Sequence, residues 1–516
     1  MRNIIYLILI SVSLLCCLQP AAAQKQADTS QLEPRLVSYR FRDYEYAYYT
    51  QQGLLLQHAP IERLGSITLG YSYLQGGLRA RQEADKVNVA SLRSEGLRKV
   101  KKITLQGYFG FTRSWEDSIG YMHSAKPEDP TPYYLLAIKQ GHWDRLHYEL
   151  GAQASTAVLN DKLLLSVGAD FDLSSNTRNS DPRPEISKYA LALNWGVGYR
   201  ITPKHTIGAW AGYAYGIETT NVGYSSVMLN AAGDAYREYQ TFLSKGFGNV
   251  LVQRSGDVRR MREDDKGYRA GGYYDGKWMG FHTSLLYKFQ TSRRTYVKPA
   301  AATADSRNDM PIASFDLEQQ WIDLFMEKHK GSDLLQLRIR YNSGEGSDYN
   351  NELAGNNYIY NNDNINAHIG YVHYTQSRPQ YELFLKGYYD KTYKADGTTS
   401  HRWSNSYATI GVDFSYYTRP NADKRFWVFN AHPAYRKGID HYLTAPTAQQ
   451  TFFTTDVLMP NTAYYARNAA SIQGGIAWQT PWKKQMLKFG ADARYEKAAD
   501  LEGRRVNLQA KVSLFY

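Results

Sequence analysis

The sequence predicts an all-β fold, namely a transmembrane up-and-down antiparallel β-barrel of about 16–18 strands. From about Gly65 to Tyr516, runs of ten or so residues alternate between apolar and polar side chains, as expected of strands that face lipid on one side and a wet lumen on the other. Tight turns and long polar loops alternate between these runs, as short periplasmic turns and long outer loops do in such barrels. The chain also opens on a segment typical of exported proteins. Together these observations predict a protein of the cell outer membrane.

Residues 1–23 are predicted to be a signal peptide. Arg2 supplies a positive charge, and the apolar run Ile4–Leu18 is too short and too early to span a membrane. Ala21–Ala23 offers small residues for cleavage, which makes Gln24 the expected first residue of the mature chain.

Both cysteines, Cys16 and Cys17, lie in the segment that is expected to be removed. The mature chain is therefore predicted to contain no disulfide, no catalytic thiol and no cysteine-bound metal. Lipidation of a cysteine is the less favoured alternative, because Leu15 stands where a small residue is preferred.

Residues 24–64 precede the first predicted strand and form a predicted periplasmic or plug segment. The segment contains Tyr44, Tyr46, Tyr48 and Tyr49. We favour partial insertion of this segment into the lumen, with a periplasmic position as the alternative. Residues 65–516 are the predicted transmembrane barrel.

Strands are assigned from the period-two alternation. The first is predicted near Gly65–Gly77, the second near Lys86–Glu95 and the last over Arg504–Tyr516. Two assignments are weaker, because Gly267–Tyr274 is short and Ser314–Glu327 has apolar residues at helical spacing that could form a loop helix. Eighteen strands follow if both are counted and sixteen if neither is.

A clear alternation marks two further strands. One apolar face consists of Leu163, Leu165, Val167, Ala169, Phe171 and Leu173, and another of Tyr189, Leu191, Leu193, Trp195, Val197 and Tyr199. The residues between them are mostly small or polar. A helix would instead repeat its apolar residues every three or four positions.

The connections contain the residues that tight reversals need. Short turns are predicted at Asn160–Asp161, Thr202–Lys204, Asp275–Gly276, Arg378–Pro379, Arg419–Asn421 and Thr480–Trp482, and long loops at Ser343–Asp363 and Lys437–Ala463. The segment Glu218–Lys266 is too long for an ordinary loop. Within it, Ala231–Leu243 could form a helix, and the segment could be an outer lid or an ornament.

The last strand carries an independent indication of the fold class. Val506, Leu508, Ala510, Val512, Leu514 and Tyr516 alternate up to a terminal aromatic residue. This pattern resembles the terminal strand signal that outer-membrane assembly machinery recognises.

The opening strands also resemble a known group of proteins. The blocks Leu64–Tyr73, Gln82–Asn88 and Ser94–Lys99 are similar to those of uncharacterised outer-membrane barrels of Bacteroidota, a family with a domain of unknown function. The resemblance implies the location, the organism group and a possible setting beside nutrient-uptake receptors. It brings no activity and no catalytic residues.

Composition agrees with a barrel but does not by itself exclude a soluble β-sandwich or propeller. The chain has 44 Tyr and 18 Phe, which suits aromatic girdles at two membrane interfaces, and its mean hydropathy is only −0.54. The net charge of +12 suits a surface that meets lipopolysaccharide phosphates, or alternatively a basic lumen. No nucleic-acid recognition motif is present.

An enzymatic site is not predicted. His282 and Ser284 share one face of a strand and resemble the His-x-Ser pair of outer-membrane phospholipases, but Leu285–Leu286 stand where that family has Asn-Gly. No Asn or Asp nearby in the sequence is placed to orient the imidazole. With Phe281 and Leu285 on lipid, the pair would face the lumen, which is the wrong side for a lipid substrate.

No metal site or cofactor is predicted either. The histidines are scattered, without a His-x-x-x-His pair, and no phosphate-binding glycine loop appears. The Asp and Asn residues of Ser343–Asp363 lack the ordered spacing of a calcium loop.

The lumen wall formed by the last three strands is predicted to be basic. If Ile472 and Leu508 face lipid, side chains of opposite parity face inward. The cations so placed are Arg467, Lys488, Arg494, Arg505 and Lys511. Glu149, Asp170 and Asp172 would face inward further round the barrel, giving a transverse field or internal ion pairs.

The leading functional hypothesis is a channel or uptake accessory for small polar or anionic solutes. The alternative is a plugged scaffold barrel that serves as a subunit of a larger outer-membrane receptor or secretion complex. The expected partners are outer-membrane lipid and lipopolysaccharide, together with a possible outer-membrane protein.

Overall fold

The computed structural model of the chain describes residues 39–125, 129–231, 236–253, 259–278, 280–299, 309–375, 378–419, 424–499 and 503–516. The predicted signal peptide and residues 24–38 lie outside these ranges.

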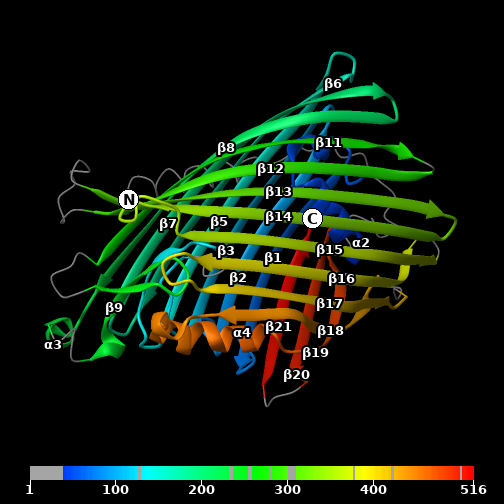
Figure 1. Ribbon diagram of the computed structural model, residues 1–516. Coiled ribbons are helices and arrows are strands. Elements are labelled where there is room, and N and C mark those ends of the chain that lie inside the picture. The colour runs from blue at the N-terminus through cyan, green and yellow to red at the C-terminus, as the bar shows by residue number, and fades with distance from the viewer. Residues whose placement is uncertain are drawn as a thin grey trace. The chain divides into compact units, whose positions relative to one another are not determined.

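Eighteen strands of the described residues form one antiparallel sheet that closes on itself (Figure 1). Each strand pairs with the next barrel strand along the chain, and β1 (Arg63–Gly76) completes the ring by pairing with β21 (Arg504–Phe515). The predicted up-and-down barrel is therefore confirmed. The strands between them are β2 (Lys86–Val100), β3 (Ile103–Ile119), β5 (Gly141–Val158), β6 (Leu163–Arg178), β7 (Arg183–Thr202), β8 (His205–Gly223), β11 (Arg260–Trp278), β12 (Phe281–Lys298), β13 (Met310–Lys330), β14 (Asp333–Asn350), β15 (Tyr358–Thr375), β16 (Arg378–Asp396), β17 (Arg402–Tyr417), β18 (Phe426–Thr444), β19 (Ala469–Trp482) and β20 (Gln485–Ala498).

The two ends of the barrel differ in their connections. At one end, here called the turn end, the strands are joined by short segments such as 101–102, 159–162 and 203–204. At the other, here called the loop end, lie the long connections 120–140, 224–259 and 445–468.

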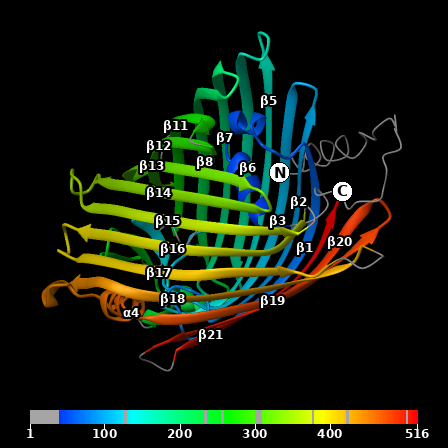
Figure 2. The ribbon, with the colours of Figure 1, turned by 90° about the vertical axis from the view of Figure 1, so that its right-hand side faces the viewer.

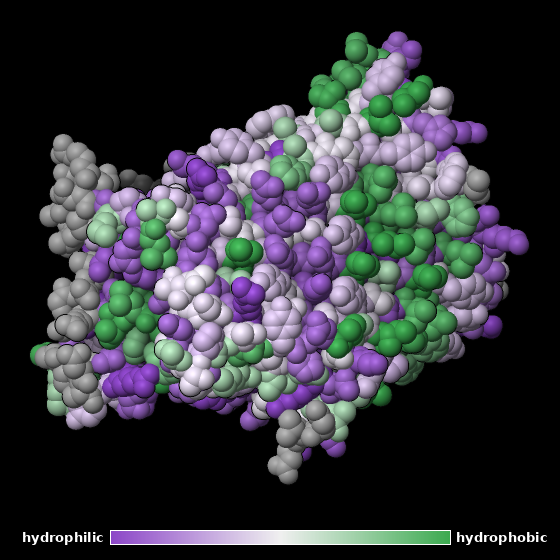
Figure 3. Space-filling view, in the orientation of Figure 1, coloured by the Kyte–Doolittle hydropathy of each residue, from purple (hydrophilic) through white to green (hydrophobic). Residues whose placement is uncertain are grey.

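Outward-facing apolar side chains form a band over the turn-end half of the strands. In the protein alone, Val167, Ile369 and Ile410 are 58–60% exposed. Lipid around the barrel would cover these side chains. On the face shown in Figure 3 the apolar residues gather on the right, where β11 to β16 reach the turn end. The loop-end halves are polar outside, as at the exposed Arg293–Asp316 ion pair of 2.7 Å. Strands longer than the roughly 9–11 residues needed to span a bilayer thus continue past the band.

The remaining elements lie at the loop end or precede β1. The loop end carries a three-stranded sheet and short helices, namely β4 (Tyr133–Leu136), α3 (Val227–Ala231), η3 (Arg237–Tyr239), β9 (Thr241–Lys245), β10 (Val250–Gln253), η5 (Thr447–Gln449), η6 (Thr454–Leu458) and α4 (Met459–Tyr465). Before β1 come α2 (Arg40–Tyr49) and η2 (Gly53–Gln57). No helix among the described residues is both long and apolar enough to cross a membrane.

The two weaker strand assignments both proved to be strands. Gly267–Tyr274 belongs to the 19-residue β11, and Ser314–Glu327 lies within β13. Leu317 and Phe325 are buried on the lumen face of β13. Their spacing of eight residues fits a helix and a strand equally, which is why the sequence alone left the choice open.

Several predicted connections were wrong. Asp275–Gly276 is not a turn, because the two residues pair with Ser284 and Thr283 of β12 and β11 continues to Trp278. Within the predicted loop Ser343–Asp363, only residues 351–357 lie outside the strands. The rest belongs to β14 and β15, whose ends resemble a loop in sequence because they extend beyond the apolar band and are polar on both faces.

Two further segments need smaller corrections. Thr480–Trp482 ends β19 rather than forming the turn. The helix considered for Ala231–Leu243 is wrong at its end, because Phe242 and Leu243 belong to strand β9 and pair with β4.

Candidate functional site in the barrel lumen

Residues 39–62, here called the inner plug, lie inside the barrel (Figure 2). They contact inward-facing side chains on opposite parts of the wall. Gln57 donates to the carbonyl of Ser155 on β5 at 2.8 Å, whereas Tyr44 donates to Asp413 on β17 at 3.2 Å. The inner plug therefore bridges the lumen.

The helix α2 presents one face to the wall. Phe41, Glu45, Tyr48 and Tyr49 are buried, and their spacing of four, three and one residues places them on one side of a helix. The Tyr48 hydroxyl donates to the Oγ of Ser284 at 2.9 Å. The Tyr48 ring stacks on Phe325 with centroids 4.9 Å apart.

The short helix η2 anchors the plug through apolar contacts. Leu54, Leu55 and Leu56 are fully buried and pack with Leu164, Trp210, Tyr273, Leu286 and Phe325 of the wall. Gly196 on β7 permits this approach, because a Cβ at that position would lie 2.7 Å from Cδ1 of Leu54.

Asp413 on β17 is the first of three carboxylates that hold the plug. Its carboxylate lies 2.6 Å from Arg40, which is on α2, and 2.5 Å from Lys386, which is on the neighbouring strand β16. His432 on β18 contacts the same carboxylate, as does the Tyr44 hydroxyl. A carboxylate buried to this degree is stable only when it is paired.

Asp323 on β13 is the second carboxylate that holds the plug. It accepts hydrogen bonds from Arg338 at 2.7 and 2.9 Å and from Arg340 at 2.7 and 3.0 Å. The plug residue Gln51 donates to it at 3.2 Å, and Lys288 donates to the amide oxygen of Gln51 at 3.1 Å.

Asp275 on β11 is the third carboxylate that holds the plug. His58 of the plug lies 3.0 Å away, and Nε2 of His282 lies 3.2 Å away. Nδ1 of His282 lies 3.1 Å from the Tyr49 hydroxyl. The sequence-based statement that no Asp can orient this imidazole was therefore wrong, because Asp275 comes from the adjacent strand. Ser284 bonds to Tyr48 rather than to His282, so these residues do not form a catalytic triad.

The loop end is covered by a folded structure, here called the outer lid, made of the described residues of connections 120–140, 224–259 and 445–468. Their apolar residues form one buried cluster with the wall, including Tyr133, Phe242 and Phe453. Thr131 and the Tyr296 hydroxyl of β12 are 2.7 Å apart. Asp396 of β16 accepts from the backbone N–H of Phe247 at 2.9 Å.

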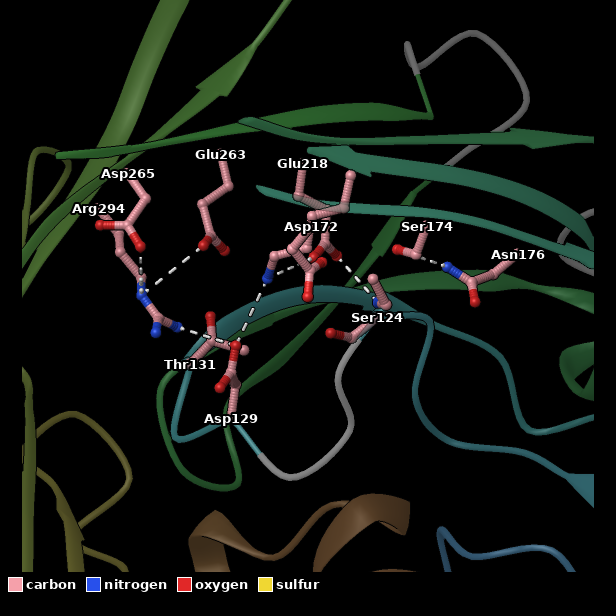
Figure 4. A network of polar contacts seen from close by, with 12 residues as sticks. Ser124, Asp129, Thr131, Asp172, Ser174, Asn176, Glu218, Glu263, Asp265 and Arg294 are labelled. Carbon is pink, nitrogen blue, oxygen red and sulfur yellow. Dashed lines mark hydrogen bonds and ion pairs between the residues drawn. The ribbon is translucent and has the colours of Figure 1, made fainter. Parts of the chain in front are cut away.

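An ion-pair network lies beneath the lid (Figure 4). Asp129 from connection 120–140 lies 3.6 Å from both Arg294 on β12 and Lys188 on β7. The backbone N–H of Ala125 donates to Glu218 at 3.1 Å. The outer lid is thus attached to the wall by charged groups as well as by apolar contacts.

His123 of the outer lid is buried as a neutral imidazole. Arg178 lies 3.4 Å from its Nε2, and the Trp143 ring packs beside it. Burial and the nearby Arg178 and Arg145 hold the pKa of His123 well below its usual value.

A cavity of about 420 Å³ lies between plug and wall. The plug contributes Thr50, Gln51 and Gln52 to its lining. The wall contributes Tyr108, Gln153, Asp170, Asn194, Trp210, Arg269, Leu286, Lys288, Phe289, Gln290, Trp321, Asp323 and Arg340. This size lies in the range of about 300–1,000 Å³ typical of small-molecule sites.

The five cations predicted to form a basic wall have different surroundings. Arg494 lies 3.3 Å from Glu496, and Arg505 lies 2.9 Å from Glu83. Lys488 lies within electrostatic range of Asp43 on α2.

The other two cations lie apart from these pairs. Arg467 precedes β19 and lines a depression at the loop end, so it is not on the predicted strand, whose pairing with β18 begins only at Ala469. Lys511 is exposed and has no ion-pair partner among the residues that the structure describes. The acidic residues that were predicted to face inward also have partners. Asp172, for example, lies 2.7 Å from His147.

The residues that sequence reasoning missed are Asp413, Asp323 and Asp275 with their partners. Each stands at an inward position of its strand, so period-two parity could have indicated them as lumen residues. Their partners come from the plug and from neighbouring strands, which the sequence does not bring together.

Solved structures with a similar chain course are outer-membrane barrels of several kinds. The siderophore receptor PiuA from Acinetobacter baumannii is 9% identical, with a TM-score of 0.36, and the match covers 88% of this chain and 82% of that one. OccAB3 from the same organism is 10% identical, with a TM-score of 0.37 and coverage of 88% and 99%. A Pseudomonas aeruginosa FadL homologue is 10% identical, with a TM-score of 0.30 and coverage of 91% and 93%. The chain matches no curated protein.

A family match covers nearly all of the described chain. Residues 53–516, from η2 of the inner plug to the last residue, match the family of unknown function DUF6850. The predicted resemblance to an uncharacterised family is thereby confirmed. The chain belongs to the DUF6850 family, and its fold is an 18-stranded β-barrel whose lumen holds an N-terminal plug.

Proposed function

We propose that this protein is a gated channel of the outer membrane that admits small polar solutes. The observation that carries the proposal is the polar cavity lined jointly by plug and wall. A barrel of this size is wide enough to leave an aqueous path where the plug does not fill the lumen. Because both the inner plug and the outer lid obstruct the lumen, passage requires each of them to move.

Liposome swelling with polyols of graded size tests the proposal. We compare the full chain, a variant lacking residues 24–62, and the same deletion combined with Asp129→Asn and Asp396→Asn. The last two substitutions remove anchors of the outer lid while leaving the turn-end wall unchanged. Swelling should rise in that order, and a folded barrel that excludes the smallest polyol in all three forms would refute the proposal.

A second candidate is a plugged scaffold barrel within a larger outer-membrane complex. The three carboxylates that anchor the plug favour it, because a permanent plug would be held in this way. Stable co-purification of a receptor or secretion component from native membranes, together with absence of swelling in every variant, would select this alternative.

The surroundings of the barrel are also part of the proposal. The outward apolar band and the charged residues beyond it support a place in the outer membrane, with lipopolysaccharide beside the loop-end half. The assignment to Bacteroidota rests on the resemblance of residues 64–99 and stays a prediction. An enzymatic role is not proposed, since Ser284 is bonded to Tyr48.

A further inference from the structure

The cavity between the inner plug and the wall has an unbalanced set of charges. Four cations, Arg269, Lys288, Arg338 and Arg340, border it or lie within electrostatic range of its Lys288. Two carboxylates, Asp170 and Asp323, line the cavity with them, and Asp170 and Asp265 lie within electrostatic range of Arg269. Within a weakly screened interior, an excess of like charge is unfavourable unless an opposite charge is present.

Both carboxylates are already committed to other groups. Asp323 accepts four hydrogen bonds from Arg338 and Arg340. Asp170 accepts from the Tyr108 hydroxyl at 2.9 Å and from the Asn194 amide at 3.4 Å. Their capacity to neutralise the remaining cations is correspondingly small.

Arg269 and Lys288 are the cations left over. Lys288 donates only to the neutral amide oxygen of Gln51, at 3.1 Å. Nε of Arg269 is buried without a hydrogen-bond partner, and so is Nε1 of Trp210 at the edge of the same cavity. Among the described residues neither cation has an ion-pair partner, and a buried donor left unsatisfied destabilises the site.

We propose that this cavity binds the oxyanion group of a small solute, a carboxylate or a phosphate, between Arg269 and Lys288. An oxyanion accepts from guanidinium and ammonium donors together, and such charge-assisted hydrogen bonds are the stronger ones. Trp321 and Trp210 offer apolar surface for the rest of the solute. This inference rests on the proposed channel function and names the class of solute that the channel would select.

Isothermal titration of the purified full chain in detergent micelles tests the inference. The probes are D-gluconate, inorganic phosphate, and sorbitol as the neutral match of gluconate. Gluconate or phosphate should bind and sorbitol should not. The anion that binds more tightly shows whether the site prefers a carboxylate or a phosphate. Lys288→Gln and Arg269→Gln should each raise the Kd about tenfold. Lys511→Gln, a matched loss of an exposed cation outside the cavity, should leave it unchanged.

Heat-modifiable migration in gels verifies that each variant is folded. The inference is overturned if neither anion binds the folded wild-type chain, or if Lys288→Gln and Arg269→Gln bind as the wild type does. Binding is measured without a membrane, so its failure is distinct from that of the channel proposal. A barrel that swells liposomes without binding either anion refutes only the oxyanion site, and one that binds without ever conducting refutes only the channel.

Discussion

At the scale of single residues, three carboxylates connect the inner plug to the barrel wall. Asp413, Asp323 and Asp275 each receive at least one plug side chain and at least one cation or imidazole from the wall. Removing one member of such a buried group leaves the others without a counter-charge, which costs about 3–5 kcal/mol in comparable cases. The plug is therefore expected to be sensitive to single conservative changes.

Asp413→Asn should loosen the inner plug. Without the carboxylate, Arg40, Lys386 and His432 lose their shared acceptor, and the docked plug is disfavoured. Trypsin cleavage after Arg40 in the folded barrel should become at least about tenfold faster, as measured by mass spectrometry. Asp316→Asn, which breaks an exposed ion pair with Arg293, is the control and should change little. Equal cleavage of both variants would show that Asp413 does not hold the plug.

At the scale of elements, period-two alternation was sufficient to predict the strands. Outward apolar positions alternate with mostly small or polar ones over residues 163–173 of β6 and 189–199 of β7, and only a strand satisfies that pattern. The helix α2 carried a usable signal in the spacing of Phe41, Glu45, Tyr48 and Tyr49, which was missed. Asp275–Gly276 was misassigned because a turn-forming pair can also lie within a strand when its carboxylate has partners inside the barrel.

The candidate site was less predictable than the strands. Lys288, Arg269 and Asp323 stand on different strands, and only the plug residue Gln51 completes their surroundings. Parity indicates that each faces inward, but not at which height or beside which plug residue. The basic wall stays a prediction, and the structure adds that Glu83 and Glu496 lie beside Arg505 and Arg494.

The outer lid should weaken in mild acid. The pKa of His123 is lowered in the folded state, so the unfolded lid binds more protons as the pH falls below about 6.5. The neutral, buried His123 therefore stabilises the outer lid above about pH 6.5, and this stabilisation is lost at lower pH. The protection factors of the amides in residues 129–140, which are exchange rates corrected for the intrinsic pH dependence, should fall between about pH 7 and 5. In His123→Gln this loss of protection should disappear, and its persistence there would assign the pH effect to another group.

At the scale of the whole molecule, the turn-end half of the barrel is the part matched to a membrane. The apolar band covers only that half, and the loop-end half carries exposed charges outside and the outer lid inside. The lumen is obstructed twice, by the inner plug and by the outer lid, with the proposed oxyanion cavity beside the plug.

Ile369→Arg should destabilise the membrane-inserted barrel by about 2–4 kcal/mol, because it places a charge in the apolar band. Tyr349→Arg, which also faces outward but on the loop-end half, should cost less than about 1 kcal/mol. Urea unfolding in lipid vesicles, followed by heat-modifiable migration, measures both. A larger effect at Tyr349 would place the membrane at the other half of the barrel.

Locking the inner plug to the wall tests the gated-channel account most directly. A Cβ at residue 53 would lie 2.9 Å from Cβ of Ser166, so a shift of under about 1 Å allows a disulfide between Gly53→Cys and Ser166→Cys. The mature chain is expected to contain no other cysteine. The measurement is solute flux into liposomes with the disulfide formed and then reduced. We predict that the oxidised barrel is closed and that reduction restores the flux of the wild type. Equal flux in the oxidised and reduced states would show that solutes pass without movement of the plug, and would contradict the account.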